Sequence, residues 1–123
     1  MAIANHRSGD PGYEGQTGLE VQDSVCRGHH TIVLRGELDM SNAEALETII
    51  QRLCIDGISG IVLDLSQLDF MDSSGLRAVL SSQATCKQHG YDLSVIPGCG
   101  AVRRLLELTG TLGVLRIEEN LAT

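Results

Sequence analysis

The chain after residue 18 first alternates apolar and polar positions, a pattern typical of β-strands that are buried on one face. It predicts one strand over residues 19–25 and a second over residues 31–35. The Arg-Gly-His segment at 27–29 is short enough to favour an antiparallel hairpin. Residues 1–17 precede this hairpin and are polar and rich in glycine, so we expect a disordered N-terminal tail.

The spacing of apolar residues changes to that of a helix after the second strand. Ser41 is a good N-cap residue, and Glu44 three positions later completes a capping box. The sequence therefore predicts an amphipathic helix over residues 42–55. Its predicted inward face consists of Leu46, Ile49, Ile50 and Leu53.

A nearly unbroken apolar run at residues 61–65 indicates a central strand that is covered on both faces. A second helix is expected to open at Ser73 and Ser74 and to end at Gly90. Its expected inward residues are Leu76, Val79, Leu80 and Ala84.

The last third of the chain predicts a strand over residues 93–96, stopped by Pro97, and a third helix over residues 102–109 that ends at Gly110. Residues 112–117 form either a short last strand or part of a closing helix. This order of elements predicts an α/β fold with a mixed central sheet of about four to five strands and helices packed mainly on one side.

Composition and charge narrow the class of protein. The chain has 123 residues, of which 42% are hydrophobic, so one domain over residues 18–123 is expected. The net charge of −7 argues against a nucleic-acid partner, because phosphate backbones require clustered Lys and Arg. No apolar run approaches the roughly 20 residues of a membrane span, and no signal peptide is recognisable. We expect a cytoplasmic protein that binds no membrane.

The four cysteines are Cys26, Cys54, Cys86 and Cys99, and no two of them form a CxxC pair. This spacing is unlike that of a zinc or thioredoxin-type site. In a cytoplasmic protein most of these residues are expected to be reduced thiols. Cys54, Cys86 and Cys99 are kept as candidates for redox chemistry, since exposure of the thiolate decides reactivity.

The segment 71–75 is the candidate functional site, because it joins the predicted central region of the sheet to the second helix. Asp72, Ser73 and Ser74 all suit a helix cap, so a plain helix start is one interpretation. A modification site is the other, because the free N–H groups and the dipole of a helix N-terminus stabilise a phosphate.

Phe70 and Met71 are expected to be partly exposed in this loop, where they would offer an apolar patch to a protein partner. An enzyme is not predicted. A nucleophile elbow requires Gly-x-Ser-x-Gly, and Met71 stands where the first glycine belongs. The four histidines are scattered, and the phosphate-binding motif Gly-x-x-x-x-Gly-Lys is absent. We therefore expect no catalytic residues, no metal and no cofactor.

In these residues the sequence resembles the STAS-domain family, specifically its anti-sigma factor antagonists. The resemblance covers about residues 18–118 and is carried by four segments: Gly-Glu-Leu-Asp at 36–39, the run at 61–66, the Asp-Ser-Ser-Gly region at 68–76 and the helix at 102–110. It implies a STAS-like single domain.

The resemblance also implies a partner-switching function. The unmodified antagonist binds an anti-sigma factor, which is also a serine kinase, and so releases a sigma factor. The kinase phosphorylates the serine that matches Ser73, and a phosphatase reverses the modification. The resemblance places the partner-binding surface at Asp39, Met40, Ser41, Met71, Asp72, Ser73, Ser74, Gly75 and Leu76.

Alternatives remain open at several positions. A STAS module in another regulatory complex, such as a stress-sensing scaffold, a redox-responsive regulator or a membrane-transport subunit, would not be gated by phosphorylation. Asp39 either contributes to the partner surface or only favours the adjacent helix N-terminus electrostatically. Arg103 and Arg104 form either a solvated helix face or a contact with the kinase. His29 and His30 are expected to be exposed at the hairpin turn.

Overall fold

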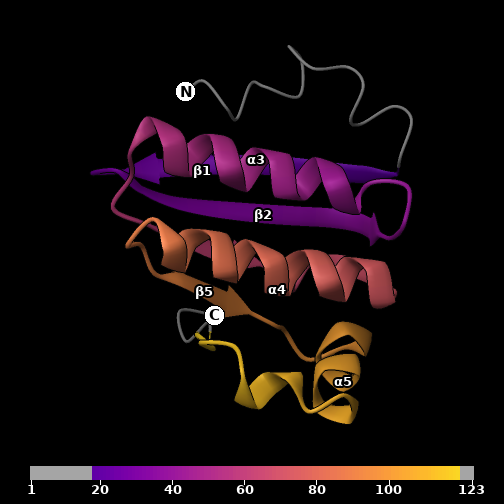
Figure 1. The fold of residues 1–123 in the computed structure, drawn as a ribbon. Helices are drawn as coiled ribbons and strands as arrows, with labels where there is room; N and C mark the ends of the chain where they lie inside the picture. The colour runs from indigo at the N-terminus through magenta and orange to yellow at the C-terminus, as the bar shows by residue number, and fades with distance from the viewer. Residues whose placement is uncertain (1–17, 120–123) are drawn as a thin grey trace.

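The computed structural model describes residues 18–119, so the predicted tail at 1–17 lies outside the described residues. Within this range the chain forms a five-stranded mixed sheet with three α-helices and one 3-10 helix (Figure 1). In chain order the elements are β1 (Leu19–Cys26), β2 (His29–Leu38), α3 (Ala43–Asp56), β3 (Gly60–Asp64), β4 (Leu68–Met71), α4 (Ser73–Gln88), β5 (Leu93–Ile96), α5 (Ala101–Leu108) and η1 (Thr111–Gly113).

The predicted hairpin is confirmed. β1 and β2 pair antiparallel from Leu19↔Gly36 to Cys26↔His29. The turn between them consists of Arg27 and Gly28, with φ angles of 54° and 79°. Positive φ at both central residues is the signature of a type I′ turn, whose twist matches that of the strands it connects.

β2 is the strand that organises the sheet, because it pairs with three others. Its first half, residues 29–33, pairs parallel with β3, and residues 36–38 pair parallel with β4 after a register shift between Gly36 and Glu37. β5 extends the sheet beyond β3. The predicted central strand β3 is confirmed, whereas β4 is a strand in a segment for which the sequence indicates a loop.

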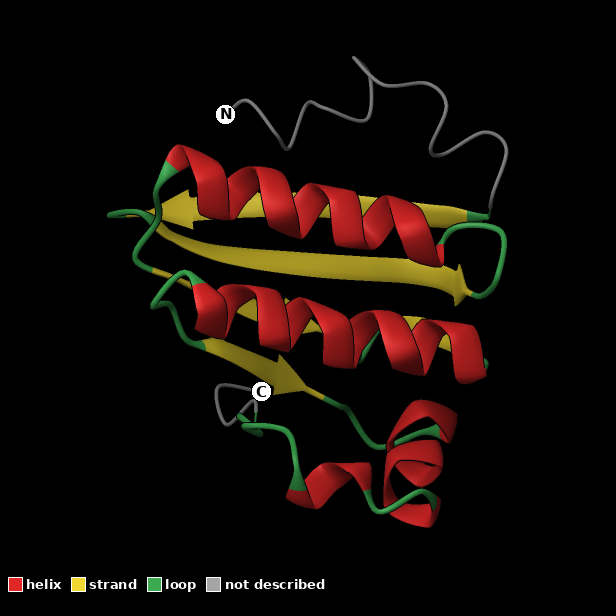
Figure 2. Cartoon of the chain, viewed as in Figure 1, coloured by secondary structure: helices red, strands yellow, loops and turns green. Residues whose placement is uncertain are grey.

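α3 and α4 lie side by side over one face of the sheet, as predicted (Figure 2). β2 contributes Ile32, Leu34 and Leu38 to the core beneath them, and each of these side chains is fully buried. All four predicted inward residues of α3 are buried as well. In α4, Val79 is buried and Leu76 and Leu80 pack against the core, whereas Ala84 is exposed and its predicted inward position is wrong.

β5 and α5 confirm the predicted strand and third helix near the C-terminus. The region 112–117 forms neither a regular strand nor part of an α-helix. Its first residues belong to the 3-10 helix η1, and Ile117 then forms an isolated parallel bridge with Val95 of β5. The chain thus returns along the outer edge of β5 (Figure 1).

Candidate functional site

The predicted site lies where β4 ends and α4 begins. Asp72 is the N-cap residue of α4, and its Oδ1 accepts hydrogen bonds from Ser74 N at 2.8 Å and Gly75 N at 3.0 Å. Its carbonyl oxygen accepts from Leu76 N at 3.0 Å. The aspartate therefore caps the helix, and the hydroxyl of the exposed Ser73 is not needed for that purpose.

Gly75 allows the first turn of α4 to approach the end of β2. A Cβ atom at this position would lie 2.6 Å from Leu38 O and 2.6 Å from Met71 Cγ. The backbone N–H of Asp72 donates to the same Leu38 carbonyl at 3.3 Å. The segment that follows β2 is thereby held next to the start of α4.

That segment begins with a turn at Asp39. Its Oδ1 accepts from Ser41 N at 2.9 Å and from Ser41 Oγ at 2.6 Å. Asn42 is the N-cap residue of α3, and its side chain accepts from Asp39 N at 3.0 Å and donates to Glu37 O at 2.9 Å. The predicted capping box of Ser41 and Glu44 is therefore wrong, because the Asp39 carboxylate engages the serine first.

Exposure separates the predicted surface residues into two groups. Met40 is 79% exposed, Phe70 is 47% exposed and Ser73 is also exposed. Met71 is only 6% exposed and belongs to the core, so the prediction of an exposed Met71 is wrong. We call the set of Asp39, Met40, Ser41, Phe70, Asp72 and Ser73 the Ser73 surface. Asp39 and Asp72 are half-buried, and the other four residues are exposed.

The remaining members of the predicted partner set lie at its border or beneath it. Ser74 and Leu76 are half-buried, and Gly75 is buried. Asp72 already occupies two N–H groups of the first turn of α4, which corrects our expectation that free N–H groups would hold a phosphate there. Additional negative charge on Ser73 would face solvent, with the carboxylates of Asp39 and Asp72 on neighbouring turns.

The cysteines fall into one buried pair and two exposed residues. Cys54 of α3 and Cys86 of α4 are buried, and the Cys54 thiol donates to Cys86 Sγ at 3.6 Å. Burial, together with this hydrogen bond, raises the pKa of Cys86 to about 12. Because the thiolate is the reactive form, this environment disfavours oxidation in the folded state. Cys26 and Cys99 are exposed.

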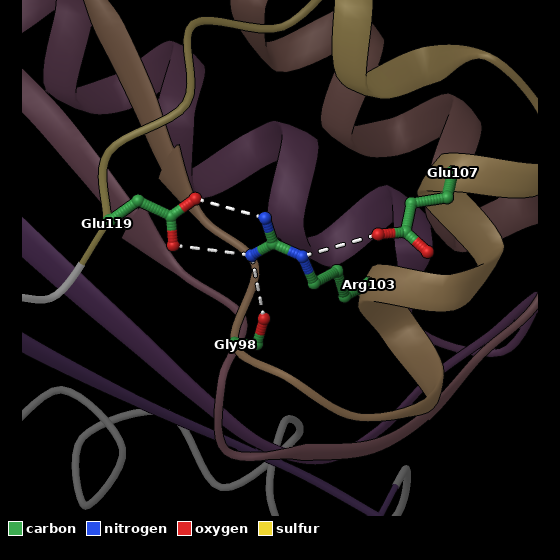
Figure 3. Close-up of polar contacts among 4 residues, drawn as sticks. All are labelled: Gly98, Arg103, Glu107 and Glu119. Carbon is green, nitrogen blue, oxygen red and sulfur yellow. Dashed lines mark hydrogen bonds and ion pairs between the residues drawn. The ribbon is translucent and has the colours of Figure 1, made fainter.

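Arg103 belongs to an ionic cluster at the start of α5, shown in Figure 3. Its guanidinium donates to Glu119 Oε1 at 3.3 Å and Oε2 at 3.1 Å, to Gly98 O at 3.0 Å, and lies 3.5 Å from Glu107 Oε2. The hydrogen bonds to Glu119, followed by its charge, raise the pKa of Arg103 above its ordinary value. These contacts connect α5 to the segment that follows η1.

The two adjacent histidines differ in their surroundings. His29 is exposed, as expected, but the side chain of His30 is only 12% exposed, so the prediction is wrong for this residue. Its Nδ1 lies 2.8 Å from Oδ2 of the buried Asp23 on β1. No group of three potential metal ligands occurs among residues 18–119, and no helix in this range is long and apolar enough to cross a bilayer.

Comparisons with known proteins identify relatives of this chain. Residues 19–123 match the family model of the STAS domain. The anti-sigma F factor antagonist of Paenibacillus polymyxa is 33% identical over 107 residues, which cover 83% of this chain and 88% of that protein.

Two solved structures illustrate the likeness in three dimensions. A Mycobacterium paratuberculosis anti-sigma factor antagonist aligns with a TM-score of 0.70 and 27% identity over 85% of this chain and 88% of its own. The phosphorylated form of the Bacillus cell fate determinant SpoIIAA aligns with a TM-score of 0.65 over 82% of this chain and 91% of its own. Its identity of 24% supports a shared fold alone.

Proposed function

The chain belongs to the STAS-domain family, and on that premise we propose that it is an anti-sigma factor antagonist that is switched off by phosphorylation of Ser73. In its unmodified form it binds an anti-sigma factor that is also an ATP-dependent serine kinase, and a sigma factor is released. A phosphatase that acts on phosphorylated Ser73 restores binding. Because these partners use ATP and control transcription, the proposed place of action is the cytoplasm.

The single observation that carries this proposal is the exposed Ser73 hydroxyl at the N-terminus of α4, next to the Asp39 turn. Because Asp72 caps the helix, a substituent on Ser73 removes no hydrogen bond of the described fold. The modification is therefore compatible with the folded state. Phosphorylation of Ser73 therefore affects the binding of a partner to the Ser73 surface.

The chemistry of the switch is a phosphoryl transfer. Ser73 Oγ attacks the γ-phosphorus of ATP, ADP leaves, and the hydroxyl proton passes to a base of the kinase. The product carries about −1.5 to −2 additional charge at neutral pH. That charge lies close to the carboxylates of Asp39 and Asp72, so the Ser73 surface becomes strongly acidic and repels a partner with which the unmodified surface is complementary.

The proposal assigns regulation by binding to this chain and no catalytic step of its own. A second candidate, a STAS module that acts without phosphorylation, is favoured by no particular contact of residues 18–119. The burial and high pKa of the Cys86 thiol oppose a redox role for Cys54 and Cys86, whereas Cys99 is exposed.

The test is made with the kinase-type anti-sigma factor from the source organism and ATP, followed by intact-mass measurement. The native chain and the Ser74→Ala control should each gain one phosphoryl group, and Ser73→Ala should gain none while still binding. Ser73→Asp should bind the partner at least about fivefold more weakly, as expected for a like charge at a contact surface. Equal affinity of Ser73→Asp and the native chain would contradict the switch.

A further inference from the structure

A groove of about 400 Å³ lies between the C-terminal half of α4, the start of β5 and the segment after η1. It is lined by the buried Leu93 and Leu115 and by six further residues: Gln83, Lys87, Tyr91, Asp92, Val114 and Arg116. Its volume is within the range of pockets that hold small ligands. Ser73 begins α4, whereas Gln83 and Lys87 lie in its last two turns, so the groove is distinct from the Ser73 surface.

The groove opens where a row of backbone hydrogen bonds stops. Val95 N donates to Arg116 O at 2.8 Å, and Glu118 N donates to Val95 O at 2.8 Å. In a parallel ladder, alternate residues point to the same edge, so the N–H and C=O of Leu93 face this same outer side. A ladder continued by two residues would pair Leu93 N with Val114 O.

The side chain of Gln83 interrupts that continuation. Its Nε2 donates to Val114 O at 3.4 Å, a long bond to the carbonyl that Leu93 N–H would otherwise reach. This bond places the amide nitrogen toward Val114 and leaves Gln83 Oε1 buried without a hydrogen-bond partner. Among residues 18–119, Leu93 N–H and C=O have no partner either. Such groups in a partly buried site are costly unless a ligand or water satisfies them.

The charged residues of the groove are Lys87, Arg116 and Asp92, so two cations and one carboxylate give its lining a net charge of +1. Lys87 is exposed and has no ion pair within the described range. Arg116 lies 3.5 Å from Asp92, but both side chains are more than half exposed, and exposed pairs of this kind contribute little. Arg116 is therefore free to exchange its partner for another carboxylate. The side chain of Tyr91 adds a flat apolar surface to the same opening.

We propose that this groove binds the free C-terminal end of an extended peptide. A peptide presents a carbonyl oxygen to Leu93 N–H and an N–H group to Leu93 C=O or Gln83 Oε1, in the manner of a strand added to a sheet edge. Its terminal carboxylate pairs with Lys87 and Arg116. The C-terminal segment already occupies the edge at Val95, so only a short terminal stretch of such a peptide can pair with β5.

The proposal is tested by titrating the ¹⁵N-labelled chain with N-acetyl-Ala-Ala, which has a free carboxylate, and with the same dipeptide capped as an amide. The free form should produce a saturable shift of the Leu93 amide signal and of the Gln83 side-chain signals. The amide form should bind about tenfold more weakly, because it lacks the charge-assisted contact. Equal binding of the two probes, or no shift of Leu93, would overturn the proposal.

Variants separate the peptide site from adventitious binding. Gln83→Leu should lower the affinity for the dipeptide with a free carboxylate about fivefold, which is the effect of one lost hydrogen bond. Gln51→Leu, on the exposed face of α3, should leave the affinity for this dipeptide unchanged. If Gln83→Leu does not fold, the exposed Lys87→Gln serves instead with the same expectation. Inorganic phosphate that reproduces the Leu93 shift would show an adventitious anion only. Ser73→Ala should bind the dipeptide normally, which keeps this test independent of the proposed switch.

Discussion

Replacement of Gly75 by alanine probes the contact that holds the start of α4 against the end of β2. The added methyl group would lie 2.6 Å from Leu38 O, 2.6 Å from Met71 Cγ and 3.0 Å from Leu38 Cγ. The first of these neighbours is a backbone carbonyl, which also accepts from Asp72 N and cannot turn away. The helix start must therefore shift outward.

The change in the free energy of unfolding that Gly75→Ala causes follows from two opposing effects. Alanine in place of glycine usually stabilises a helix, by up to about 1 kcal/mol. Overpacking of a well-packed site costs about 1–3 kcal/mol. We expect a net loss of about 1–2 kcal/mol in the free energy of unfolding for Gly75→Ala. Because Ser73 moves with the helix start, the proposed phosphorylation of Ser73 should also become slower.

The assay is urea denaturation followed by circular dichroism, with Gly113→Ala as the matched control. Gly113 also lies in a helical turn, but its added Cβ meets no atom within 4 Å and its φ angle is not positive. The control should be neutral or more stable by about 0.4–1 kcal/mol, because alanine restricts the unfolded chain. A Gly75→Ala variant as stable as the native chain would refute the close contact that we infer.

Two further predictions concern the cap and the thiols. Asp72→Ala removes the acceptor of two backbone N–H groups and should lower the free energy of unfolding by about 1 kcal/mol in the same assay, whereas Asp69→Ala, on the exposed side of β4, should change little. An equal loss in both variants would argue against the cap. In a thiol-disulfide exchange assay at neutral pH, Cys26 and Cys99 should react quickly and Cys54 and Cys86 only after unfolding. Fast reaction of all four thiols in the native protein would contradict the buried pair.

Long periodic segments of the sequence predicted their structure correctly. The apolar spacing at Leu46, Ile49 and Leu53 identified α3, because a helix that covers a sheet must bury one continuous side. The continuous apolar run of β3 likewise predicted its central position. In both elements the positions that are apolar in the sequence are the positions that tertiary packing buries.

Short segments were harder to predict because tertiary contacts decide them. β4 has only four residues, and its two buried positions, Leu68 and Met71, are three residues apart and not two. The register shift at Gly36 and Glu37 of β2 accompanies this irregular spacing. No alternation of apolar and polar residues therefore marks the strand, and the sequence pattern wrongly predicts Met71 at the surface.

In the candidate site, too, some features were predictable from the sequence and others depend on tertiary contacts. Ser73 and its position at a helix start followed from residue types and from the family resemblance. The roles of the neighbouring polar residues did not, because several side chains compete for the same backbone groups. Asp39, Asn42 and Ser41 are all good capping residues, and only the path of the chain after Leu38 decides which of them meets which N–H group.

The pairing of β2 with three other strands affects the order in which parts of the domain unfold and exchange their amide hydrogens with solvent. β1 pairs with one edge of β2, and β3 and β4 pair with the other edge. The amide hydrogens of β2 should therefore exchange with solvent only through unfolding of the whole domain. The Asp39 turn follows β2 directly, so the Ser73 surface lies next to the strand whose amide hydrogens should exchange most slowly. Within residues 18–119, the segment beside the groove has backbone hydrogen bonds to β5 only at Val95, and its other polar contacts come from the side chains of Gln83, Asp92 and Arg103. Its amide hydrogens should therefore exchange through a local fluctuation of lower energy.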